Sequence, residues 1–135
     1  MRIAIMVTRG LLGAMGVVQV ALGVLLWTGH ALGSVPLHMA IGAGFVLALW
    51  VLAVLCARAG APAGLVAIAV AWGAFLLAFG VTQTRLLPGP AHWVIRVVHL
   101  LTGIVAMGLG AALTARTRRR EEAVPAEARV IGGLG

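Results

Sequence analysis

The stretch that decides the fold covers residues 36–57 and reads PLHMAIGAGFVLALWVLAVLCA. It contains no Asp, Glu, Lys or Arg, and His38 is its one imidazole. As an α-helix it would extend about 33 Å, enough to cross about 30 Å of hydrocarbon. A single segment in lipid must pair its backbone polar groups internally, which a helix does. The stretch is therefore predicted to be a transmembrane helix.

Three further stretches have the same character and cover residues 11–28, 62–83 and 91–115. Of the 135 residues, 62% are hydrophobic, and the mean hydropathy is +1.13. A soluble domain of this size could not bury so much apolar surface. The expected fold class is all-α, a four-transmembrane-helix bundle built from two helix-pair repeats. The domain is expected over 1–117, with the repeats at about 11–58 and 62–115, and a disordered cytoplasmic tail over 118–135.

The charges are divided unevenly between the two ends of such a bundle. All ten basic residues are arginines, and the three acidic residues are glutamates in the tail. If the segments alternate in direction, most arginines lie on the side of the termini, and Arg85 is the basic residue in the opposite loops. The positive-inside rule then places both termini in the cytoplasm of a prokaryote, with the chain in its inner membrane. The net charge of +7 therefore indicates topology and a lipid bilayer as partner, and not nucleic-acid binding.

His38 and His99 are the candidate metal ligands. Each lies a short way inside an apolar stretch, and a glycine follows four residues later, Gly42 or Gly103. An ionisable group within a membrane span suggests a function. Two imidazoles at similar depth on parallel helices suit bis-histidine ligation of one haem b per chain. The alternative is that each ring bonds a backbone carbonyl or water near the interface.

Glycines in the first and third stretches also recur at matching positions, as expected for a repeated helix pair. A shift of 57 residues pairs Gly16 with Gly73 and Gly23 with Gly80, whereas the histidine stretches match at a shift of 61. Small residues allow close helix packing in membranes. A flat glycine face can also accept the edge of a porphyrin. We therefore expect Gly23 and Gly80, like Gly42 and Gly103, to line the cofactor.

Arg96 and His92 share one helical face with His99, since the spacings are three and four residues. Arg96 lies one turn nearer the outside, where it could pair with a haem propionate, because arginine suits carboxylates. It could instead extend to the membrane interface. His92 could bind a propionate, a metal ion or a quinone, or be a hydrated loop residue.

These motifs resemble one four-helix half of haem A synthase over about residues 11–112. The resemblance is carried by the run from Gln19 to Gly23, by His38 opening its stretch, and by the run His99-Leu100-Leu101. The di-histidine membrane b-type cytochromes are more loosely similar. The resemblance implies haem between the second and fourth helices near the outer surface. The catalytic half of that family has a glutamate where this chain has Val35, so the chain looks like the cofactor-binding half.

The sequence thus favours an integral membrane haem b protein that transfers electrons or handles haem near the extracytoplasmic face, and not a stand-alone enzyme. Partners would be a quinone or a redox protein, with a homo-oligomer or a larger membrane complex as the assembly. One alternative is a small non-catalytic subunit of a respiratory or haem-maturation complex. Another is a haem-free structural membrane protein.

Overall fold

The computed structural model describes residues 1–132, and it describes the side chains of residues 1–120 and 122. The helices are α1 (Arg2–Trp27), α2 (Val35–Arg58), α3 (Ala63–Thr82) and α4 (His92–Gly132), with short 3-10 turns η1 (Leu32–Ser34) and η2 (Gln83–Arg85). The described residues contain no strand. The predicted all-α class with four helices is confirmed, and α2 and α3 end within one residue of the predicted bounds.

Two helix ends differ from the prediction. α1 begins at Arg2 instead of residue 11, so that Arg9 lies inside the helix. α4 continues to Gly132, through most of the tail that the composition predicts to be disordered. Alanine, glutamate and arginine dominate residues 118–129, and all three are strong helix formers. Residues 133–135 lie outside the described part of the chain.

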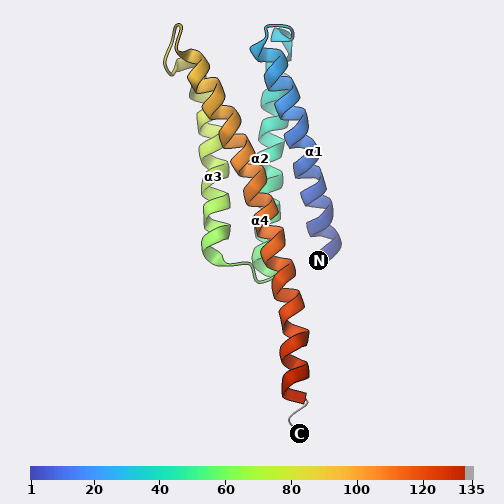
Figure 1. The fold of residues 1–135 in the computed structure, drawn as a ribbon. Coiled ribbons are helices and arrows are strands. Elements are labelled where there is room, and N and C mark those ends of the chain that lie inside the picture. Colours follow the sequence, from blue (N-terminus) through green and yellow to red (C-terminus); the bar gives the residue numbers. More distant parts are fainter. Residues whose placement is uncertain (133–135) are drawn as a thin grey trace.

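The four helices run up and down in turn, so that α2 and α4 point in the same direction (Figure 1). α2 and α4 each pack against all three other helices, including each other. α1 and α3 flank this central pair. We call the end where α2 and α4 begin the histidine end, and the opposite end, which holds the N-terminus and Arg58, the arginine end.

Each of the four helices is long and apolar enough to cross a membrane. Many large apolar side chains point outward, as expected for lipid-facing surfaces. The largest fully buried side chains are Leu49, Leu52, Leu113, Val46 and Cys56. They lie in the second half of α2 and beside it on α4, so the core is concentrated between the middle of the bundle and the arginine end.

The histidine end is packed more loosely. No residue of α2 before Phe45 is buried, and no residue of α1 after Gly16. On α4, Ile95 and Thr102 are buried in this half. The helices α1, α2 and α4 therefore bury more residues toward the arginine end than toward the histidine end.

Two glycines set the distance between helices near the middle of the bundle. Gly16 of α1 lies against Met107 of α4. Gly73 of α3 lies against Val46 and Trp50 of α2, where an added methyl group would be 3.0 Å from Cγ1 of Val46. The indole N–H of Trp50 donates to the carbonyl of Val70, 3.1 Å away. Helix approach through small residues is a common form of membrane packing.

We expect Gly73→Ala to weaken the bundle, because its methyl group would lie 2.5 Å from Nε1 of Trp50. Displacing the indole should lower the free energy of unfolding by about 1–3 kcal/mol. Titration of the detergent-solubilised protein with SDS, followed by circular dichroism, measures this change. Gly64→Ala is the matched control on α3, where nothing lies within 4 Å, and should be neutral or slightly stabilising. Equal stability of the two variants would contradict the packing described here.

Candidate functional site

His38 lies in the first turn of α2 and His99 in the second turn of α4. Pro36 helps to start α2, because a first-turn residue needs no N–H for the helix. Since the two helices are parallel and in contact, both imidazoles enter the bundle from the histidine end. Their ring centres are 6.4 Å apart, and the ring planes are tilted by 60°. The structure thus brings together the two residues predicted as ligands.

A glycine on the neighbouring helix faces each imidazole. A methyl group at Gly23 of α1 would lie 3.8 Å from Cε1 of His38. One at Gly80 of α3 would lie 3.3 Å from Cε1 of His99, a tighter approach. Gly23 and Gly80 therefore border the histidine rings. Because glycine has no side chain, each ring can lie close to the neighbouring helix.

Neither imidazole makes a hydrogen bond to the part of the chain that the structure describes. Nδ1 of His38 and Nδ1 of His99 are both buried without a partner. A buried polar atom left unpaired costs about 1–3 kcal/mol, and native proteins rarely leave one so. Two such atoms on facing rings indicate a site that a bound group completes.

Gln19 fixes the start of α2 from across the helix pair. Its Nε2 donates to the carbonyl of His38 at 2.9 Å. The amide occupies the space in front of Gly42, where a methyl group would be 2.5 Å from Nε2. Gly42, predicted to line a cofactor, thus faces Gln19. Oε1 of Gln19 is a third buried atom without a partner.

Three residues that the sequence reasoning did not select lie around His99. The hydroxyl of Thr102 donates to the carbonyl of His99 at 2.7 Å. The indole N–H of Trp72 on α3 donates to the carbonyl of Thr102 at 2.9 Å. The Phe79 ring lies 5.8 Å from the His99 ring, centre to centre. The spacing of three residues from His99 to Thr102 was a usable signal, whereas the contacts from α3 depend on the packing.

The other predicted residues of α4 lie around His99 in different settings. Arg96 is exposed, one helical turn nearer the histidine end. His92 begins α4, and its Nδ1 donates to the carbonyl of Leu86 at 3.1 Å, which ties it to the preceding loop. Gly103 lies one turn deeper than His99, with open space where a methyl group would stand. Arg96 and Gly103 thus border the site, and His92 anchors the loop above it.

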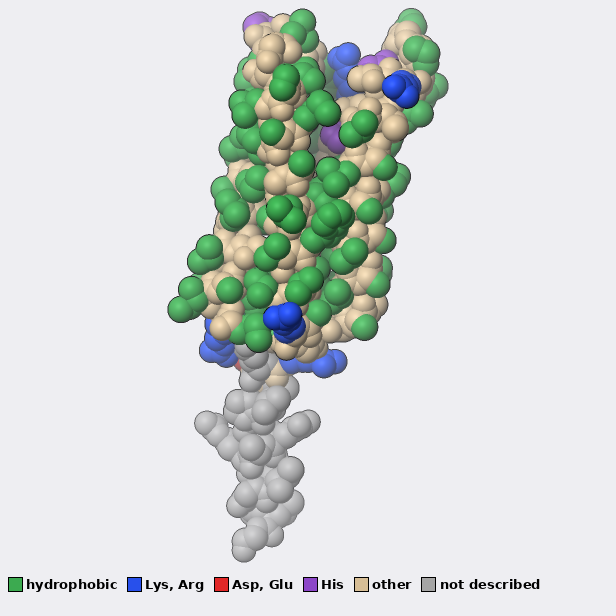
Figure 2. Space-filling model, turned by 180° about the vertical axis from the view of Figure 1, so that it is seen from behind, with side chains coloured by type: hydrophobic (Ala, Val, Ile, Leu, Met, Phe, Trp, Pro, Cys, Tyr) green, Lys and Arg blue, Asp and Glu red, His purple; other side chains and the backbone are tan. Residues whose placement is uncertain are grey.

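The separation of the rings is compatible with two imidazoles on one iron. With metal–nitrogen bonds of about 2 Å, each ring centre lies about 3.2 Å from the metal, so two opposite rings are about 6.4 Å apart. The rings here are 6.4 Å apart. Figure 2 shows the molecule hollowed between two helix columns near this end, with a histidine side chain inside the hollow. The two imidazole donors therefore have a separation that one haem iron between them would require.

Corresponding contacts recur on the two sides of the bundle. Gly23 meets His38, and Gly80 meets His99. These pairs are related by the two sequence shifts of 57 and 61 residues. The same shifts relate the contact of Gly16 with Met107 to that of Gly73 with Val46, with the helix roles exchanged. The contacts agree with a duplicated helix pair, which stays a prediction.

Among the side chains that the structure describes, no three or more His, Cys, Asp or Glu residues gather where they could hold a metal ion. A haem iron needs only two ligands from the chain, because the porphyrin supplies the other four. Comparisons with models of protein families, with curated proteins and with solved structures find no match to this chain.

Proposed function

We propose that this protein binds one haem b in the membrane through His38 and His99 and transfers electrons or handles haem near the histidine end. The pair of facing imidazoles carries the proposal. Their ring centres are 6.4 Å apart, and each has a buried Nδ1 without a partner. Two His ligands make a haem low-spin and suited to one-electron transfer.

The residues around the pair would prepare it to receive the iron. Gln19 holds the carbonyl of His38, and Thr102 holds that of His99. Both bonds hold backbone atoms, so the helix segments that carry the two ligands would be ordered before haem arrives, which reduces the conformational entropy lost on binding. Gly23 and Gly80 would let the rings turn edge-on between the helices without a clash. Open space at Gly103 would leave room beside His99.

Arg96 would supply the positive charge that the carboxylates of a haem need. Residues 1–120 contain no aspartate or glutamate, so no acidic residue of the membrane part can pair with it. Its place one turn outward from His99 suits propionates directed toward the membrane surface. A guanidinium pairs well with a carboxylate, because it offers two parallel N–H donors.

The proposal includes the orientation and the relationship inferred from the sequence. The arginine end would face the cytoplasm of a prokaryotic cell, as the positive-inside rule requires. The haem would then stand near the outer surface, where a quinone or a redox protein could exchange electrons with it. A relationship to the cofactor-binding half of haem A synthase is supported by the histidine positions. Val35 in place of a glutamate argues against hydroxylation of haem.

The direct test is the visible spectrum of the purified protein. We expect a sharp Soret band, and α and β bands after reduction, as six-coordinate low-spin haem gives. His38→Ala and His99→Ala should each lose most of the haem or turn it high-spin. His92→Ala is the matched control, since its ring bonds the loop carbonyl of Leu86. A protein isolated without haem that also fails to take up added haem would support the structural or quinone-binding alternatives.

The two ring–glycine contacts should respond differently to a methyl group. Gly80→Ala would press on His99 at 3.3 Å, whereas Gly23→Ala would meet His38 at an ordinary 3.8 Å. Moving a ring off its preferred torsion costs about 0.5–1.5 kcal/mol, so we expect a two- to twelvefold weaker haem affinity for Gly80→Ala. Gly23→Ala should change little. Titration of the apoprotein with haem measures both, and the reverse order would refute the assigned geometry.

Arg96→Leu should leave the axial ligands in place but lower the midpoint potential, because a nearby cation favours the reduced iron. A fivefold change in the equilibrium constant corresponds to about 40 mV for one electron, which a redox titration resolves. Arg85→Leu is the matched control, since it removes an exposed arginine from η2 at the same end. Equal potentials for the two variants would show that Arg96 has no special place beside the haem.

A further inference from the structure

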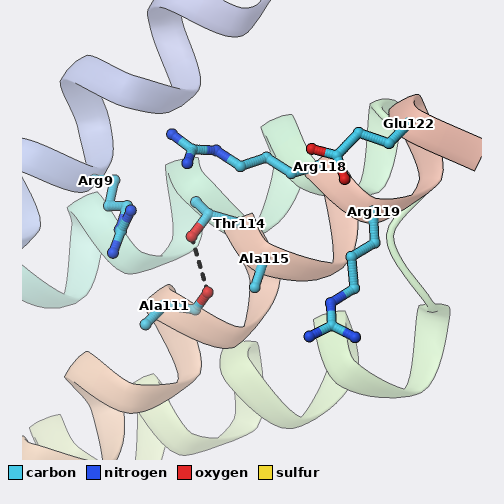
Figure 3. A pocket seen from close by; sticks show the side chains of 7 residues that line it. All are labelled: Arg9, Ala111, Thr114, Ala115, Arg118, Arg119 and Glu122. Carbon is cyan, nitrogen blue, oxygen red and sulfur yellow. Dashed lines mark hydrogen bonds between the residues drawn. The ribbon is translucent and has the colours of Figure 1, made fainter.

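A second hollow lies at the arginine end, between α1 and α4, far from the histidines. Its volume is about 330 Å³, and its lining residues are Arg9, Ala111, Thr114, Ala115, Arg118, Arg119 and Glu122. Figure 3 shows Arg9 extending from α1 and Arg118 extending from α4 toward the same space. The pocket thus spans the seam between the two helices at the level of the arginine-rich membrane surface.

The pocket carries an excess of positive charge. Three arginines line it, with Glu122 as the one acidic lining residue. None of the three arginines makes an ion pair with a side chain that the structure describes. The hydroxyl of Thr114 is already used, because it donates to the carbonyls of Gly110 and Ala111. The free donors in this pocket therefore belong to the arginines, and an anion with several oxygen atoms suits them.

An apolar hollow continues from this pocket toward the middle of the membrane. It has a volume of about 150 Å³ and is lined by Arg9, Leu12, Gly13, Met107 and Ala111. Arg9 and Ala111 line both hollows, which are therefore adjacent. Leu12 follows Arg9 by one turn on α1, and no atom lies within 4 Å of a methyl group placed at Gly13. The seam is thus cationic at the surface and apolar and open below it.

We infer that the seam between α1 and α4 binds an anionic phospholipid. Its phosphate would lie between Arg9 and Arg118, and one acyl chain would follow the surface of Leu12, Gly13 and Met107. A free phosphate ion would use the cationic pocket alone and leave the apolar hollow without a role. Basic pockets between transmembrane helices are known to receive lipid headgroups on the cytoplasmic side. This site is independent of the proposed haem site.

The test uses the full-length protein in neutral detergent, with phosphatidylglycerol added to the micelles and thermal unfolding followed by circular dichroism. A ligand that binds the folded state raises its stability according to ligand concentration and affinity. We expect phosphatidylglycerol to stabilise the wild type more than phosphatidylcholine does. Arg9→Gln combined with Arg118→Gln should need about tenfold more phosphatidylglycerol or lose the response, since it removes charge-assisted hydrogen bonds.

Two further variants separate a specific site from general attraction. Arg58→Gln combined with Arg120→Gln removes the same charge at the same end, outside the pocket, and should respond like the wild type. Gly13→Leu keeps every charge and fills the apolar hollow, so it should also lose much of the response. Circular dichroism without lipid verifies that each variant is folded.

Three results would overturn the inference. The first is an equal loss of response in both double variants, which would indicate attraction between the membrane surface and the whole arginine end. The second is a normal response of Gly13→Leu, which would remove the acyl chain from the site. The third is that sodium phosphate alone stabilises the wild type as much as phosphatidylglycerol does, which would identify the ligand as a free anion.

Discussion

The contact between α2 and α4 along the centre of the bundle is the constraint on which the rest of the structure depends. Leu49 and Leu52 of α2 and Leu113 of α4 are fully buried near the arginine end. Toward the histidine end, the same two helices carry few buried residues. Because the helices are parallel and in contact, His38 and His99 lie at one level near the histidine end, with ring centres 6.4 Å apart.

The sequence predicts the helices well because the bilayer allows few alternatives. A segment such as 36–57 must pair its own backbone groups, so length and hydropathy are enough to find it. The parallel course of the second and fourth helices follows from alternation, which is why the meeting of His38 and His99 could be expected. The early start of α1 was missed because Arg9 interrupts the apolar run, although one arginine near a helix end can extend to the surface.

The different surroundings of Gly42 and Gly103 could not be predicted from the sequence. Gly42 and Gly103 hold equal places after their histidines, yet Gly42 faces Gln19 and Gly103 faces open space. The difference comes from α1, whose amide reaches the carbonyl of His38. The hydrogen bond from the Trp72 indole to the carbonyl of Thr102 was hidden for the same reason. A periodic pattern indicates which residues share a helix face. It does not indicate which residue of another helix contacts that face, because this depends on how the helices pack.

The membrane part of the chain supplies no anionic side chain to the arginines at either end of the bundle. Residues 1–120 contain no carboxylate side chain, so the arginines there have no acidic partner within those residues. Arg96 at one end is exposed, Arg9 at the other lines the apolar hollow, and neither forms an ion pair with a described side chain. Within residues 1–120, the helices are therefore not held in register by ion pairs with carboxylate side chains. Their register rests on close contacts such as those of Gly16 and Gly73, which leaves the charged groups available for ligands from outside the chain.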